Sequence, residues 1–438
     1  MSAPRDADAD GALGWHPTAA VLRVSVLPAG LALLAVLLRR PDLLVLVAPL
    51  ALAALPLVRR PAGRPRAALE VGSGWVPEGD PVPASVSVVD ADGAQTAALE
   101  LGTPDRVQPE PGTVAAGVLR PAGAGFTVPL RLTARRWGWS AVGPATLVLS
   151  ACGGLLRAGP ATVPAARVRV VPLSARYAGA ALVPRARGGV GLHRSQRLGE
   201  GTELAGIRPF APGDRIRRVN WRTTLRTGEL QVNATTTERD AVVLLLLDAR
   251  FDAGTSGGVD GRASGVDVAV RATAALAAFY LDLGDRVGLV AAAATTRVLA
   301  ARTGRGQLER VLTALLGTSA PGAGGAEPRL TVPPDLDPRA LVLVVSPLVG
   351  RAVFERVAGL SRAGHAVVVV DTLPPDALPA DADPWTGPVT RLWLLERATR
   401  IGQLQLLGVP VVPWRGSGSL DPVLVELTRA AARSGARR

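Results

Sequence analysis

The chain has no lysine, a single cysteine and only three histidines among its 438 residues. One cysteine excludes an intramolecular disulfide framework. The histidines, His16, His193 and His365, lie far apart in sequence, which argues against a zinc site. No serine or cysteine stands in a pattern that pairs a nucleophile with a base, so we expect no enzyme activity and no cofactor.

The positive charge comes entirely from arginine. The chain carries 49 basic against 36 acidic residues, a formal net charge of +13. A basic chain can bind nucleic acid, but these arginines are scattered rather than clustered on one element. Arginine without lysine, together with much Gly and Pro, is typical of a GC-rich genome. The charge is therefore a weak argument for nucleic acid.

Two apolar runs follow an N-terminal tail at residues 1–18. Residues 19–38 form a stretch of twenty residues with one charge, the length that a bilayer requires. Residues 43–58 form a second, slightly short run, which flanking arginines or local thinning can accommodate. Together they predict a transmembrane hairpin at 19–58. A cleaved signal peptide is the alternative, but the first run is too long and the second follows at once.

Arginines on the two sides of this hairpin predict its orientation. The connecting loop carries Arg39 and Arg40, whereas four arginines follow the second run between residues 59 and 66. The positive-inside rule therefore places both termini in the cytoplasm. We expect a two-span protein of the cell membrane with cytoplasmic soluble domains.

The remaining chain alternates in two different ways. Residues 67–172 contain short runs of alternating polarity separated by Gly, Pro and Asp turns, which predict an antiparallel β-sandwich. Residues 241–434 alternate continuous apolar runs with helical patterns, which predict a doubly wound α/β domain with a parallel sheet. Asp248 ends the first strand of that sheet, where ligands of this fold class bind.

Between these domains, residues 173–240 form a connecting segment that contains the densest cluster of polar chemistry. Its residues 210–232 read FAPGDRIRRVNWRTTLRTGELQV. Pro212 and Gly213 suit a type II turn, which would present Asp214 to an arginine such as Arg217 or Arg222.

This segment resembles the bacterial domain of unknown function 58 (DUF58) family, whose members couple such a motif to a von Willebrand factor A-like domain. Ten ordered positions match the family pattern: Arg208, Phe210, Pro212, Gly213, Asp214, Arg217, Val219, Asn220, Trp221 and Arg226. Leu225 departs from the alanine of that pattern. The resemblance extends over about residues 67–414 and implies a fold without implying an enzyme.

The resemblance also implies a metal site, from which this sequence departs. Metal-binding von Willebrand A domains carry Asp-x-Ser-x-Ser after the first strand, whereas this chain has Asp248, Arg250 and Asp252. The second carboxylate of the family is replaced by Pro347 after Ser346. Magnesium needs oxygen ligands, which an arginine cannot supply. We therefore expect no metal, with Arg250 paired to Asp248 or Asp252.

Three interpretations of the motif remain. A structural clasp between the sandwich and the α/β domain is favoured, with Trp221 buried against Ile216 and Val219; a partner-binding surface comes next, and catalysis last. In the α/β domain, residues 248–252 and 346–351 are expected to contact a partner. On that basis Arg250→Glu should weaken association without changing the melting temperature.

Two function hypotheses follow. The first, implied by the resemblance, is a membrane-anchored interaction or scaffold protein that works with an AAA+ ATPase of the MoxR type in assembly or maturation of envelope or secreted components. Residues 304–307, GRGQ, lack the ending of a phosphate-binding loop, so any ATPase activity would belong to a partner. The second is an arginine-rich binder of nucleic acid or anionic lipid, suggested by Arg185, Arg187, Arg194 and Arg197.

Overall fold

The computed structural model divides into two units, Met1–Val171 and Pro172–Arg438. The residues that the structure describes are 13–55, 57, 60–72, 74–102, 106–110, 116–119, 123, 125–172, 198–199, 203–211, 214, 216–236, 242–320, 330–338, 340–375, 383–416 and 418–426. Arg185, Arg187, Arg194 and Arg197 lie outside the described residues, as do Pro212 and Gly213. Each unit is described by itself.

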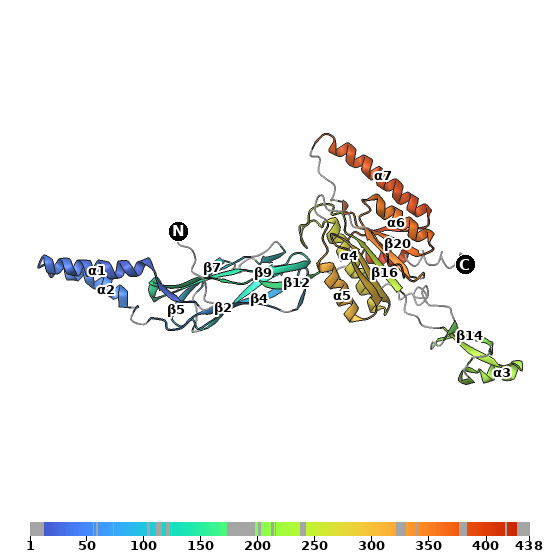
Figure 1. The fold of residues 1–438 in the computed structure, drawn as a ribbon, viewed down its shortest axis with the longest axis horizontal. Helices are drawn as coiled ribbons and strands as arrows, with labels where there is room; N and C mark the ends of the chain where they lie inside the picture. Colours follow the sequence, from blue (N-terminus) through green and yellow to red (C-terminus); the bar gives the residue numbers. More distant parts are fainter. Residues whose placement is uncertain are drawn as a thin grey trace. The chain divides into compact units, whose positions relative to one another are not determined.

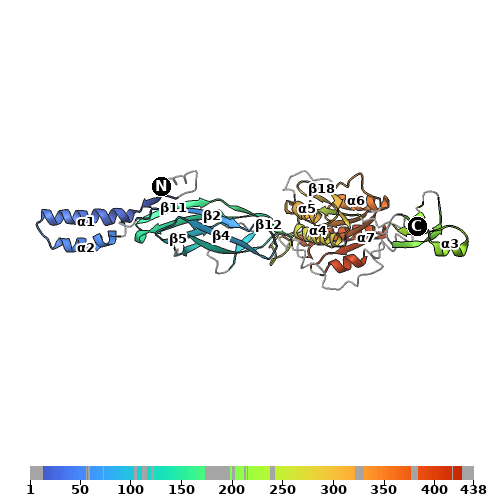
Figure 2. The same cartoon turned by 90° about the horizontal axis from the view of Figure 1, so that it is seen from below.

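Two apolar helices begin the first unit. Helix α1 (Ala19–Leu37) has 19 residues and α2 (Leu43–Ala54) has 12, and the two lie side by side in both views (Figures 1 and 2). In the described part of the chain, α1 alone is long and apolar enough to cross a membrane. Exposed leucines and valines cover both helices, as a lipid environment would require.

The segment before α1 is part of the β-domain. Strand β1 (Trp15–Pro17) pairs antiparallel with β11 (Leu156–Val163). The Leu13 amide donates a hydrogen bond to the Pro65 carbonyl at 2.7 Å, and Trp15 Nε1 donates to the Gly63 carbonyl at 3.1 Å. Residues 13–17, which belong to the predicted N-terminal tail, therefore pair with the β-domain, while residues 1–12 lie outside the described residues. The chain leaves the β-domain at β1 and returns to it at β2.

The base of α1 also packs on this domain. The Thr18 amide donates to the Leu155 carbonyl at 2.9 Å, and Val21 and Val24 contact a small apolar cluster that includes Cys152. Cys152 is buried. The hairpin is thus joined to the β-domain by backbone pairing and by packing.

Antiparallel pairing dominates the β-domain, as predicted. Its five-stranded sheet runs β1, β11, β10 (Ala145–Ala151), β5 (Ala94–Leu101) and β7 (Ala116–Leu119). Its four-stranded sheet runs β2 (Arg66–Val71), β4 (Pro81–Val89), β8 (Phe126–Ala134) and β6 (Val107–Pro109). A third sheet comprises β3 (Trp75–Pro77), β12 (Ala166–Val171) and β9 (Gly138–Val142), with β3 and β12 parallel.

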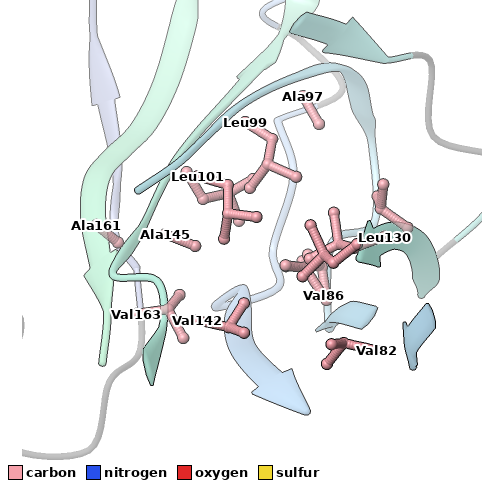
Figure 3. Packing of buried hydrophobic residues seen from close by; sticks show 14 of the residues in the cluster. Val82, Val86, Ala97, Leu99, Leu101, Leu130, Val142, Ala145, Ala161 and Val163 are labelled. Carbon is pink, nitrogen blue, oxygen red and sulfur yellow. The ribbon is translucent and has the colours of Figure 1, made fainter. Parts of the chain in front are cut away.

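One core unites these sheets. Val82, Val86 and Leu130 from the four-stranded sheet lie near Leu99 and Ala145 from the five-stranded sheet (Figure 3). Buried and partly exposed residues alternate along β10, because successive strand residues point to opposite faces. The core is built mainly of Val, Leu and Ala, the residues that the alternating runs supplied.

The α/β region of the second unit contains a six-stranded sheet. The strand order is β18 (Arg297–Arg302), β17 (Arg286–Ala292), β16 (Val242–Asp248), β19 (Leu341–Ser346), β20 (Ala366–Asp371) and β21 (Val411–Pro413). All neighbours are parallel except β17 and β18. The sequence pattern did not predict β18. Because β18 pairs antiparallel with β17, the sheet is mixed rather than wholly parallel.

Four long helices pack on this sheet. They are α4 (Gly265–Asp282), α5 (Arg305–Leu316), α6 (Arg351–Arg362) and α7 (Thr386–Leu406). Helix α4 contacts α5 and the central strands, while α6 and α7 share an apolar cluster with Leu244, Leu246 and Val344. Because β16 is buried on both faces, its sequence is one continuous apolar run.

The described residues between 198 and 236 form a small sheet with one helix, and we call this region the family motif because it carries the positions that match the DUF58 pattern. Strands β13 (Leu198–Gly199) and β14 (Glu203–Pro209) both pair antiparallel with β15 (Gln231–Thr236). A 3-10 turn, η5 (Ile216–Arg218), and helix α3 (Trp221–Thr227) connect β14 to β15.

Candidate functional site

The carboxyl edge of the six-stranded sheet carries the first candidate site. Asp248 ends β16 and Ser346 ends β19, two adjacent parallel strands. The chain order reverses at this point, because β17 continues on one side of β16 and β19 on the other. Ligands of doubly wound folds bind in the crevice that such a reversal opens.

In this protein an arginine from the same loop binds Asp248. Arg250 Nε donates to Asp248 Oδ1 at 2.7 Å and Arg250 Nη2 donates to Asp248 Oδ2 at 3.2 Å. Ser346 Oγ donates to Asp248 Oδ2 at 2.8 Å. The side chains of Arg250 and Asp248 are 1% and 0% exposed. We call Asp248, Arg250 and Ser346 the carboxyl-edge cluster.

The cluster does not fit a divalent cation. Both oxygens of Asp248 accept from neighbouring side chains, and a guanidinium lies where a cation would need oxygen ligands. Asp252 Oδ1 accepts from the Val266 amide at 3.0 Å, at the first turn of α4. Within the described ranges, no three His, Cys, Asp or Glu side chains come together in a group that could hold a metal.

Burial corrects the expected role of this cluster in partner contact. Asp248, Arg250 and Ser346 are 1%, 4% and 0% exposed as residues. None of the three can touch a docked protein unless the loop opens. Arg250→Glu would place a second carboxylate beside Asp248 inside the domain, so the burial of this pair favours a lowered melting temperature over the unchanged one expected from the sequence.

A second arginine, Arg397, binds the end of the neighbouring strand β20. Arg397 of α7 donates from Nη2 to Asp371 Oδ1 at 2.5 Å and to the Pro347 carbonyl at 3.0 Å. Asp371 ends β20, and Pro347 follows β19. Hydrogen bonds from Arg250 and Arg397 therefore connect groups at this edge of the sheet to one another within the domain, which indicates a structural role.

The second candidate site is the family motif. Arg208 donates from Nη1 to Asp214 Oδ2 at 2.7 Å and from Nη2 to Asp214 Oδ1 at 2.6 Å. This hydrogen-bonded pairing raises the pKa of the Arg208 guanidinium above its ordinary value. Asp214 Oδ2 also accepts from the Ala211 amide at 2.9 Å. The motif aspartate is therefore held as predicted, but by Arg208 rather than by Arg217 or Arg222.

Polar side chains attach α3 to its sheet. Asn220 caps the helix by accepting from the Thr223 amide at 3.1 Å, and its Nδ2 donates to Asn233 Oδ1 of β15 at 2.8 Å. The Gln231 amide donates to Thr224 Oγ1 at 3.0 Å. Gly228 ends the helix with φ 76°, a conformation that glycine adopts without steric cost.

The apolar side chains of α3 point the other way. Trp221 is 59% exposed and Leu225, four residues later on the same helical face, is 85% exposed. Arg222 and Arg226 form a neighbouring exposed pair at the same spacing. We call these four residues the outer face of α3. The predicted burial of Trp221 against Ile216 is therefore wrong, since Ile216 is itself 71% exposed.

The other motif positions divide between core and surface. Val219 is 8% exposed and forms a bridge with Val232, and Phe210 is half-buried. Arg217 is exposed. No sequence signal separated these roles, because Trp221 and Val219 are both apolar residues that a core would accept.

Comparison with known proteins agrees with the resemblance for part of the chain. Residues 206–400 match the model of the family described as protein of unknown function DUF58, and this span includes both candidate sites. Uncharacterized proteins of Mycobacterium tuberculosis and Mycobacterium bovis are 30% identical over 186 residues. That region is 40% of this chain and 56% of theirs, so the chain matches little more than half the length of these relatives.

Among solved structures, a non-cellulosomal cohesin from the archaeon Archaeoglobus fulgidus is similar to a short part of the chain. It matches 24% of this chain and 91% of the cohesin at 14% identity, with a TM-score of 0.17.

Proposed function

We propose that this protein is a membrane-anchored, non-enzymatic interaction protein and that the outer face of α3 is its partner-binding surface. The inverted polarity of α3 carries this proposal. Threonine and asparagine side chains attach the helix to its sheet, while Trp221 and Leu225 face outward. An amphipathic helix normally buries its apolar stripe, so an outward stripe is unfavourable in water unless something covers it.

The residue types on this face suit protein binding. Tryptophan and arginine are enriched among the residues that dominate binding energy at protein interfaces. The outer face of α3 offers both, on a helix with a side-chain cap and a glycine stop. The clasp interpretation assumed that Trp221 is buried locally against Ile216, whereas both residues are largely exposed.

The resemblance to the DUF58 family names the kind of partner to test. We propose an AAA+ ATPase of the MoxR type, acting with this protein in the assembly or maturation of envelope or secreted components. The resemblance is the reason for choosing this partner, and residues 206–400 are the part of the chain that matches the family model. The proposal leaves the energy source with the partner.

We further propose that the α/β region is von Willebrand A-like. Supporting features are the parallel order from β17 to β21, the antiparallel edge strand β18 and an aspartate at the end of β16. In this protein Arg250 is proposed to supply internally the positive charge that a metal ion supplies in metal-binding members. The carboxyl-edge cluster is then a structural element rather than an adhesion site.

For the anchor we propose two membrane crossings, with α2 as the second. Strand β1 before α1 and strand β2 after α2 belong to one β-domain, which lies on one side of any membrane. If α1 crosses, the chain must cross back before residue 66. Helix α2 and the residues that follow it are the segment that can do so, with thinning or snorkelling to offset its length.

Cysteine accessibility tests this topology. In a Cys152→Ser background, Arg40→Cys should react with a membrane-impermeant maleimide in intact cells, and Ala62→Cys should react only after permeabilisation. The reverse pattern would place the soluble domains outside the cytoplasm. Equal reactivity of both positions would show that the hairpin does not cross. Native Cys152 is buried and cannot serve as the probe.

Co-purification tests the binding function. The full chain in detergent should retain the MoxR-type ATPase encoded in the same genome, and Trp221→Ala together with Leu225→Ala should abolish retention while the protein stays folded. Threonine Thr227, exposed on the same helix, offers the control variant Thr227→Ala, which should bind normally. Loss of the ATPase from the wild-type protein, with tight salt-sensitive binding of nucleic acid, would favour the arginine-rich binder instead.

A further inference from the structure

The outer face of α3 has a charge pattern as well as an apolar stripe. Arg222 and Arg226 are exposed and lie one helical turn apart, a rise of about 6 Å along the axis. The helix contains no acidic residue, since its sequence is WRTTLRT. The two oxygens of Asp214, the motif carboxylate, accept hydrogen bonds from Arg208. The outer face thus combines an aromatic and an aliphatic side chain with two positive charges.

From this arrangement we infer that the partner segment is an acidic amphipathic helix. It should place apolar side chains against Trp221 and Leu225 and carboxylates one turn apart against Arg222 and Arg226. Residues four apart on a helix have the same spacing on both partners, so glutamates at i and i+4 match the two arginines. Arginine binds carboxylates with two parallel hydrogen bonds, which adds geometric specificity to the charge attraction.

A protein segment fits this face better than nucleic acid does. Single-stranded nucleic acid is bound by stacking successive bases on several aromatic rings. Helix α3 offers one ring, Trp221, beside an exposed leucine that gives no stacking platform. Trp221 and Leu225, at positions i and i+4, instead suit contact with the apolar anchors of an amphipathic helix.

This inference rests on the proposed binding function but is tested separately from the ATPase. The probe is a synthetic 18-residue amphipathic peptide with leucines on one face and glutamates at i, i+4 positions on the flank. Its matched control has lysine in place of each glutamate. Binding to the full-length protein in detergent is measured by fluorescence anisotropy at two salt concentrations.

We expect the glutamate peptide to bind at least about tenfold more tightly than the lysine peptide, with weaker binding at higher salt. Arg222→Ala/Arg226→Ala should remove most of that salt dependence, whereas Trp221→Ala should weaken binding at both salt concentrations. Arg302→Ala, on exposed β18, is the matched arginine control and should change nothing. The charge-reversed variant Arg222→Glu/Arg226→Glu should restore tight binding when it is paired with the lysine peptide.

Three outcomes would overturn the inference. They are equal binding of the two peptides, binding that ignores both arginines, and tighter binding of a 20-nucleotide single strand or of anionic phosphatidylglycerol vesicles than of the glutamate peptide. Retention of the ATPase with no sensitivity to salt or to the two arginines would keep the proposed function and reject the acidic partner. Selective binding of the glutamate peptide without ATPase retention would support the acidic partner and reject the proposed ATPase.

Discussion

Two parts of the second unit use arginine in opposite ways. At the carboxyl edge of the sheet, Arg250 is buried and its guanidinium binds Asp248 from the same loop. On α3, Arg222 and Arg226 are exposed beside Trp221 and Leu225. The carboxyl edge has the position of a ligand site in this fold class, yet its polar side chains form hydrogen bonds with one another. The second part lies on an exposed helix and presents the residue types found at protein interfaces.

The position of a residue in the fold and the freedom of its side chain to bind a ligand must therefore be judged separately. A strand-end aspartate at a topological reversal is the place to look for a ligand. Here the hydrogen bonds of Arg250 and Ser346 use that aspartate, so the capacity to bind lies with side chains that the fold leaves outside.

The largest effect is expected at the buried pair. Asp248→Ala leaves the Arg250 guanidinium inside the domain without its carboxylate and should lower the free energy of unfolding by about 3 to 5 kcal/mol. Arg250→Glu should be similarly harmful. Urea unfolding of the full chain, with hydrogen exchange of β16 to assign the transition, measures the effect. Asp248→Ala/Arg250→Met should recover much of the loss, and an unchanged single variant would contradict a desolvated pair.

A smaller effect is expected at the partly exposed pair of the motif. Asp214→Ala removes two hydrogen bonds to Arg208, whose side chain is 34% exposed and can be rehydrated. We expect a loss of about 1 to 2 kcal/mol, below that at Asp248. Hydrogen exchange at β14 and β15 reports it. A loss larger than at Asp248 would mean that the motif loop is more deeply packed than the structure shows.

Trp221→Ala should affect binding far more than stability. A buried tryptophan would cost about 3 to 5 kcal/mol when truncated. Because Trp221 is 59% exposed, we expect a change within about 0.5 kcal/mol. Thermal unfolding and ATPase retention should be measured on the same preparation. A melting temperature that falls sharply together with binding would restore the clasp interpretation.

The smallest expected effect is that of divalent ions. Addition of magnesium or manganese, or of EDTA, should leave the unfolding of the full chain unchanged, because the carboxyl-edge cluster offers a guanidinium where a cation needs oxygen ligands. Calorimetric titration measures binding directly. Stoichiometric micromolar binding that Asp248→Ala abolishes would show that the arginine can move aside.

Sequence periodicity predicted most of the α/β region because most of its elements have one strong signal. The run VVLLLLD is apolar at every position because β16 is buried on both faces. Strand β18 was missed since it lies at the sheet edge, where its exposed positions leave the sequence RVLAAR without a strand signal. In the N-terminal part, WHP gave no indication that it would pair with β11, a contact across about 140 residues of chain.

Residue identity alone was enough to locate the apolar runs and the motif, and to show that an arginine and a proline replace the oxygen ligands of the metal-binding pattern. It also suggested Asp248 or Asp252, the two aspartates of the same loop, as the partner of Arg250. Only the tertiary structure decided that Asp248 is the partner, that Arg208 rather than Arg217 or Arg222 holds Asp214, and that Trp221 faces outward. Such choices depend on which side of a short helix or loop faces the sheet. In α3 that side is set by two hydrogen bonds with strand β15, one donated by Asn220 to Asn233 and one accepted by Thr224 from the Gln231 amide, which local sequence does not reveal.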